Sequence, residues 1–229
     1  MARYEAPGGA DGMPVVSGAR VAEFNLGSVP VRIEFPFLLV AVLTGARAGS
    51  VLLLLAWVVV VFVSILIHEL GHAVAGRAYG GQVRILLHGM GGLTYRTGRY
   101  LTDAEDIVVS LAGSITQILV LGLPALFLLR TDAIDSFTLH AIVSDVAWVS
   151  FGWAIINLLP LLPFDGGNIA VTLLRRVNGV DAVRVVRVIS VGVALGVALW
   201  AYHAVGPLTS LWVLFFGALN AVALTKKGT

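Results

Sequence analysis

The segment from Ser50 to Ile67 contains no charged residue, and a run this long and apolar is typical of a helix that spans a lipid bilayer. Similar runs recur along the 229 residues, so that 58% of the chain is hydrophobic and only 12% is charged. Soluble domains carry about 25% charged residues, and a chain of this size cannot bury so much apolar surface in one water-soluble core. The composition therefore excludes a soluble globular protein and a disordered one, and it predicts a polytopic membrane protein.

The apolar runs, together with the Pro and Gly residues between them, predict an all-α fold of about six transmembrane helices. The first 28 residues are Gly-rich and lack a continuous apolar stretch, so we interpret residues 1–28 as a mostly irregular N-terminal arm and residues 29–229 as a single membrane-embedded domain. A short strand, Val29 to Phe35, is expected just before the first span. The expected spans are Phe35–Gly45, Ser50–Ala78, Asp106–Leu129, Leu139–Leu162, Val186–Ala204 and Leu208–Leu224.

The distribution of basic residues predicts the orientation of these spans. If both termini are cytoplasmic, 13 of the 15 Lys and Arg residues lie in cytoplasmic segments, and only Arg47 and Arg130 lie outside. Short loops rich in Lys and Arg stay in the cytoplasm, so both termini are expected there. The basic residues flank apolar runs instead of gathering on one polar face, which argues against a nucleic-acid partner. The chain has no Cys, so disulfides and thiolate metal ligands are excluded.

The motif His68-Glu69-Leu70-Gly71-His72 follows the apolar run directly. Two His at positions i and i+4 project from the same helix face, at the spacing that chelates one zinc ion. Glu69 can then act as general base for a water molecule whose pKa the zinc lowers to about 7. Each ionisable group in an apolar span raises the free energy of membrane insertion by roughly 2.5–3.5 kcal/mol, so three such groups together indicate a functional site. The motif therefore predicts a metal site.

A catalytic zinc ion takes three protein ligands and a water molecule, so a third ligand is expected. Asp165 is favoured by its setting, because Pro160, Pro163 and the following Gly166-Gly167 break the helix inside the membrane. Broken backbone at that depth is tolerated where it is buried in protein or lines a hydrated cavity. The other candidates are the remaining acids and imidazoles of the spans and their edges, namely His88, His140, Asp145 and His203.

At these motifs the sequence resembles the site-2 protease family of intramembrane zinc metalloproteases, in its small bacterial form. The His68–His72 motif is similar to the family's first metal motif, and Asn157–Gly167 is similar to its second, Asn-x-x-Pro-x-x-Pro-x-Asp-Gly. Leu111-Ala112-Gly113 resembles the start of an intervening Leu-Ala-Gly-Pro-x-x-Asn motif, but Ser114 replaces its proline and Gln117 its asparagine. We expect this departure to affect local helix packing and not the metal.

The resemblance implies one Zn²⁺ per chain with His68, His72 and Asp165 as ligands, Glu69 as the catalytic residue and Asn157 as a substrate-binding residue. It implies a metalloendopeptidase of the bacterial cytoplasmic membrane that hydrolyses peptide bonds in or next to transmembrane segments of membrane-protein substrates. The alternative is a non-proteolytic membrane protein that binds helices or transports metal. A transporter is expected to show repeat symmetry and facing acids along a pathway, which the sequence lacks. A pseudoprotease is expected to have lost Glu69 or a ligand.

Two β-like runs, Gln82–His88 and Leu93–Arg96, flank a Gly-rich turn directly after the metal-motif helix. They predict a short membrane-associated hairpin. A transmembrane substrate must unwind before water can reach its peptide bonds, and its unpaired N–H and C=O groups then need partners. We therefore expect an exposed edge of the hairpin to pair with the substrate, and proline at Arg84, Leu86 or His88 to weaken that pairing. The alternative is a surface loop that only connects two spans.

Overall fold

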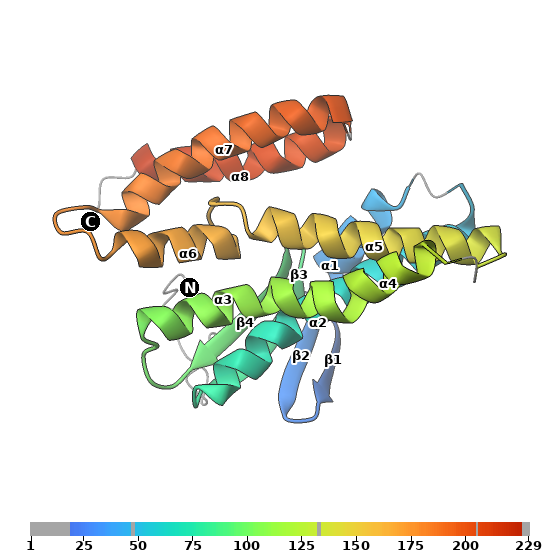
Figure 1. Ribbon diagram of the computed structural model, residues 1–229, viewed down its shortest axis with the longest axis horizontal. Helices are drawn as coiled ribbons and strands as arrows, with labels where there is room; N and C mark the ends of the chain where they lie inside the picture. Colours follow the sequence, from blue (N-terminus) through green and yellow to red (C-terminus); the bar gives the residue numbers. More distant parts are fainter. Residues whose placement is uncertain (1–18, 47–48, 132–133, 205, 226–229) are drawn as a thin grey trace. The chain divides into compact units, whose positions relative to one another are not determined.

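The computed structural model describes residues 19–46, 49–131, 134–204 and 206–225 (Figure 1). They divide into two compact units, which are described separately. Among the described residues, the sheet unit holds those from Ala19 to Leu101 together with Ala112–Ala154, and the helical unit holds Thr102–Leu111 and those from Ile155 to Thr225. The expectation of one membrane-embedded domain over residues 29–229 stays a prediction.

A four-stranded sheet forms the base of the sheet unit, with strand order β1-β2-β3-β4. β2 runs parallel to β3, and the other two pairs are antiparallel. Parallel neighbours need a crossover connection, which α1 and α2 provide. The strands are β1 (Arg20–Leu26), β2 (Val29–Glu34), β3 (Gln82–His88) and β4 (Gly91–Thr97), and the two helices are α1 (Phe35–Thr44) and α2 (Val51–Ala78).

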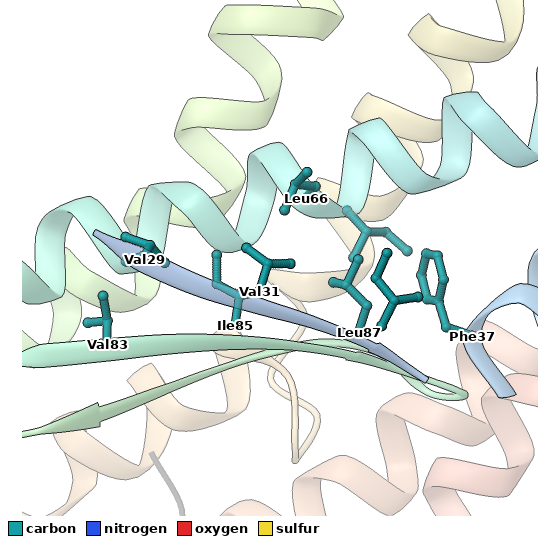
Figure 2. Close-up of a cluster of buried hydrophobic side chains, with 10 residues drawn as sticks. Val29, Val31, Phe37, Leu66, Val83, Ile85 and Leu87 are labelled. Carbon is teal, nitrogen blue, oxygen red and sulfur yellow. The ribbon is translucent and has the colours of Figure 1, made fainter. Parts of the chain in front are cut away.

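Alternating apolar residues place one face of this sheet against α2. Val29 and Val31 of β2 and Ile85 and Leu87 of β3 point to the same side and are buried. Figure 2 shows them beneath Leu66 of α2, with Phe37 at one end of the cluster. Because successive strand residues face opposite sides, a one-residue slip of either strand would turn that strand's apolar residues away from α2. This packing fixes the sheet against the helix that carries the metal motif.

Within the segment interpreted as a mostly irregular N-terminal arm, Arg20–Leu26 form β1, whereas residues 1–18 lie outside the described residues, so the interpretation of residues 1–28 stays a prediction. One expectation about this region is corrected. The hairpin predicted over Gln82–Arg96 is present as β3 and β4, but β3 is an interior strand because β2 pairs with its other edge. Of the two hairpin strands, β4 is the one at an edge of the described sheet, so the proline positions on β3 test the integrity of the sheet and not a free edge.

The helices agree with most of the predicted spans. Four are long and apolar enough to cross a membrane, and two shorter apolar helices cover residues 35–44 and 209–225. The described chain is thus mostly helical with one small sheet, and six spans are not established by helix length alone. The remaining helices are α3 (Asp103–Gln117), η1 (Ile118–Gly122), α4 (Leu123–Leu129), α5 (Phe137–Asn157), α6 (Asp165–Leu174), α7 (Ala182–Ala204) and α8 (Pro207–Thr225).

The span that contains α3 and α4 is interrupted by the π-helical turn η1, which was not predicted from the sequence. Pro124 explains it, because proline has no N–H to donate to the carbonyl four residues earlier and its ring collides with that carbonyl. A single wider turn relieves this conflict without ending the helix. α3 therefore ends at Gln117, within the membrane-spanning stretch.

In the helical unit, the break predicted from Pro160 and Pro163 is present between α5 and α6. Its backbone is supported by α7 and α8, which lie side by side (Figure 1). The N–H of Leu162 donates to Ser190 Oγ of α7 at 2.9 Å, and the carbonyl of Leu162 accepts from Asn220 Nδ2 of α8 at 2.7 Å. Unwound backbone within a membrane needs such partners, so these two side chains hold the loop that leads to Asp165.

Candidate metal centre

His68 and His72 project from the same face of α2, one turn apart, and both are buried, with 2% and 8% of their surface exposed. Their Nε2 atoms are 3.0 Å apart. Two histidine nitrogens on one tetrahedral zinc ion, each at about 2.0–2.1 Å from the metal, are about 3.3 Å apart. The observed separation is close to this value, so the two side chains fit a shared metal ion.

The ring of His68 is held from its other side by α3. Its Nδ1 atom lies 3.2 Å from Oε1 of Gln117, a residue with no exposed surface. The replacement of the family's asparagine by Gln117 was expected to affect local helix packing and not the metal, and the structure places this side chain against the first histidine of the metal motif. The available signal was an amide in an apolar span, where a polar group needs a partner.

Two glycines allow α2 and α3 to approach closely at this point. A Cβ atom at Gly71 of α2 would lie 2.5 Å from the carbonyl oxygen of Ala112, and a Cβ atom at Gly113 of α3 would lie 2.3 Å from His72 Nε2. Small residues at such crossings let helix backbones pack against each other in a membrane. Gly113 also leaves the space that the two imidazoles occupy, so it belongs to the site although it offers no ligand.

The carboxylate of Glu69 is held by β4. Thr94 Oγ1 donates a hydrogen bond to Glu69 Oε2 at 2.6 Å, and a Cβ atom at Gly92 would lie 2.4 Å from Oε1. Gly92 and Thr94 are two residues apart, so they face the same side of the strand. Glu69 is only 4% exposed. The hairpin thus fixes the orientation of the proposed base. The hydrogen bond between Thr94 and Glu69 was not predicted from the sequence.

Asp165 and Asn157 belong to the helical unit, whereas His68, Glu69 and His72 lie together in the sheet unit. Asn157 is the last residue of α5 and is buried, and Asp165 is the first residue of α6. The glycine after Asp165 is required by the turn, because a Cβ atom at Gly166 would lie 2.1 Å from the carbonyl oxygen of Leu158. The roles of Asp165 as third ligand and of Asn157 in substrate binding stay predictions.

The other candidate ligands lie on β3, α5 and α7. His88 ends β3, and its Nδ1 accepts a hydrogen bond from the backbone N–H of Met90 at 3.3 Å in the hairpin turn. Burial lowers the pKa of His88, although the charges of Glu34 and Glu69 act in the opposite direction. His140 on α5 and His203 on α7 are exposed, and Asp145 is half-buried.

Comparison with known proteins relates the chain to metalloproteases. The family model described as Peptidase family M50 matches residues 132–202. The curated protein named "Putative zinc metalloprotease Rip3" from Mycobacterium tuberculosis is 32% identical over 194 residues, which are 80% of this chain and 46% of that protein. A second, "Putative zinc metalloprotease sll0528" from Synechocystis, is 28% identical over 166 residues, 68% of this chain and 42% of that protein. The chain spans about half the length of the curated relatives that it matches.

Among solved structures, the site-2 protease from Methanocaldococcus jannaschii has a similar fold. The TM-score is 0.61 at 21% sequence identity, and the match covers 93% of this chain and 99% of that chain.

Proposed function

Because this chain belongs to peptidase family M50, the site-2 proteases, we propose that it is a zinc-dependent metalloendopeptidase that cleaves membrane-protein substrates in or next to their transmembrane segments. The observation that carries the proposal is the convergence of His68 Nε2 and His72 Nε2 at 3.0 Å, beside a carboxylate on the same helix. The apolar helices make the chain an integral membrane protein, in keeping with a substrate that lies in the bilayer.

The residues divide the chemistry of hydrolysis between them. His68, His72 and Asp165 would hold the zinc ion, which when bound supplies a Lewis acid that activates water and stabilises negative charge on the carbonyl oxygen. Glu69 takes a proton from the attacking water and passes it to the amide nitrogen as the C–N bond breaks. The hydrogen bond from Thr94 keeps this carboxylate in one orientation during both transfers.

The hairpin supports a further part of the proposal, the binding of an unwound substrate. β4 is an edge strand of the described sheet, and its residue Thr94 contacts Glu69. A substrate strand that pairs with β4 would satisfy its own backbone groups beside the proposed base. Asn157 is proposed to bind substrate backbone as well, on the family resemblance alone.

Metal binding is the first test. We expect the purified chain to hold about one zinc ion, because two imidazoles and one carboxylate are a ligand set that would hold a catalytic zinc ion. The double variant His68→Ala/His72→Ala should lose it, since two of three ligands are removed. His203→Ala is the matched control, because His203 is an exposed histidine of another helix. Zinc content is measured by atomic absorption after dialysis, and full occupancy in the double variant would disprove the assignment.

Orientation is the second test. We propose six spans with both termini in the cytoplasm, because 13 of the 15 Lys and Arg residues then face that side. The chain has no Cys, so a single Cys can be introduced at Tyr100, which is 82% exposed between β4 and α3. It should react with an impermeant maleimide only from the cytoplasmic side. Ser136→Cys, between α4 and α5, should react only from outside, and the reverse pattern would overturn the topology.

A further inference from the structure

Gln117 is a buried amide whose position helix packing alone does not explain. It ends α3 in a membrane-spanning stretch and has no exposed surface. Its Oε1 lies 3.2 Å from His68 Nδ1, and within the described chain its Nε2 has no hydrogen-bond partner. An apolar side chain of the same length would avoid the cost of burying an amide. The contact with His68 is therefore the property of Gln117 that such a side chain could not supply.

The contact with Gln117 bears on which ring nitrogen of His68 carries the proton. A neutral histidine carries one N–H and one lone pair, and the hydrogen bond made by one nitrogen decides which form is present. When Gln117 Oε1 accepts from Nδ1–H, the lone pair of His68 lies on Nε2. That nitrogen is the one 3.0 Å from His72 Nε2. The amide thus selects the tautomer that can bind metal on the side where the second histidine lies.

We propose that Gln117 is a positioning residue for the metal centre, which holds His68 in its Nδ1–H tautomer and so presents Nε2 as a preformed ligand. This rests on the proposed function, because it takes His68 as a zinc ligand. Metal-bound histidines commonly donate their other N–H to an oxygen, and loss of that partner typically weakens metal affinity about 10–100-fold. A carbonyl oxygen supplied by a span residue fills this role where water is scarce.

The matched variants are Gln117→Met and Gln117→Glu. Met keeps the length and removes both polar atoms, whereas Glu keeps the length and can only accept when ionised. Zinc affinity of the purified full chain is measured by competition with a chromophoric chelator. We expect Gln117→Met to bind zinc about 10–100-fold more weakly and Gln117→Glu to bind it within a few-fold of the original chain. Ser150→Ala, which removes a fully buried hydroxyl of α5, is the control and should leave the affinity unchanged.

A second measurement does not depend on metal or activity. In the zinc-free chain labelled with ¹⁵N-histidine, the His68 nitrogen shifts report which nitrogen carries the proton. The original chain should show the Nδ1–H form, and Gln117→Met should show a mixture or the Nε2–H form. Unchanged shifts and unchanged affinity in Gln117→Met would overturn the positioning role. Equal weakening by Met and Glu would show that the amide donates instead of accepting, which also overturns it. Absence of zinc binding in the original chain would reject the proposed function itself.

Discussion

Replacement of Glu69 by Gln is expected to abolish peptide-bond hydrolysis while zinc remains bound. Gln has the same length and can still accept a hydrogen bond from Thr94, so the packing under β4 is kept. It cannot take a proton from water at neutral pH, and general acid–base catalysis typically contributes about 10²–10⁴-fold. We expect the rate to fall by at least this factor, because the same group serves in both proton transfers. The rate is measured on a reconstituted single-span substrate.

The cellular version of this experiment also identifies substrates. Membrane proteins that become shorter in cells with the original chain, but not with Glu69→Gln, are candidate substrates. Glu105→Gln is the matched control, because Glu105 is a carboxylate in the first turn of α3 that accepts a hydrogen bond from the backbone N–H of Thr102. It should leave cleavage unchanged. Cleavage by Glu69→Gln at the original rate would remove Glu69 from the mechanism.

Gly113→Ala is expected to remove both zinc binding and cleavage, although it adds only one methyl group. The new Cβ atom would lie 2.3 Å from His72 Nε2 and 2.9 Å from His68 Cε1, so both imidazoles must move away from position 113. Because this moves the ligands themselves, we expect zinc affinity to fall by more than the roughly 100-fold upper range for outer contacts. The affinity is measured by chelator competition and the activity on the same substrate.

Two features separate this effect from unfolding. Ala is a better helix former than Gly by about 0.8–1.0 kcal/mol, so the change favours α3 as a helix. Gly152→Ala in α5 is the matched control, since no atom lies within 4 Å of its added Cβ, and it should leave zinc affinity and cleavage unchanged. Normal zinc affinity in Gly113→Ala would mean that the histidines do not occupy the space beside Gly113.

The helices and the metal motif could be predicted because the relevant signals are local. The run after Ser50 predicted α2 to about Ala78, and the structure has it as Val51–Ala78. Helical periodicity alone places His68 and His72 on one face, which the structure confirms. The break before Asp165 also follows from local chemistry, since proline cannot continue a helix. Each of these predictions uses residues within a few turns of one another.

The errors concern contacts between residues far apart in the chain. β1 was missed, and β3 was expected to have a free edge, because nothing in the sequence shows that Val31 pairs with Ile85. The contact of Gln117 with His68 was not predicted for the same reason, since His68 is 49 residues away from it. Such contacts depend on which faces of helices and strands pack together, a choice that local patterns restrict but do not make.

The sequence by itself thus determined the chemistry that is available: an apolar chain for a membrane, and two imidazoles and a carboxylate on one helix turn. Only the tertiary structure decided how those groups are held. β4 brings Thr94 to Glu69, and α3 brings Gly113 and Gln117 to the histidines. The physical reason is that ligand spacing follows from the geometry of a single helix, whereas tautomer and orientation depend on hydrogen bonds from separate elements.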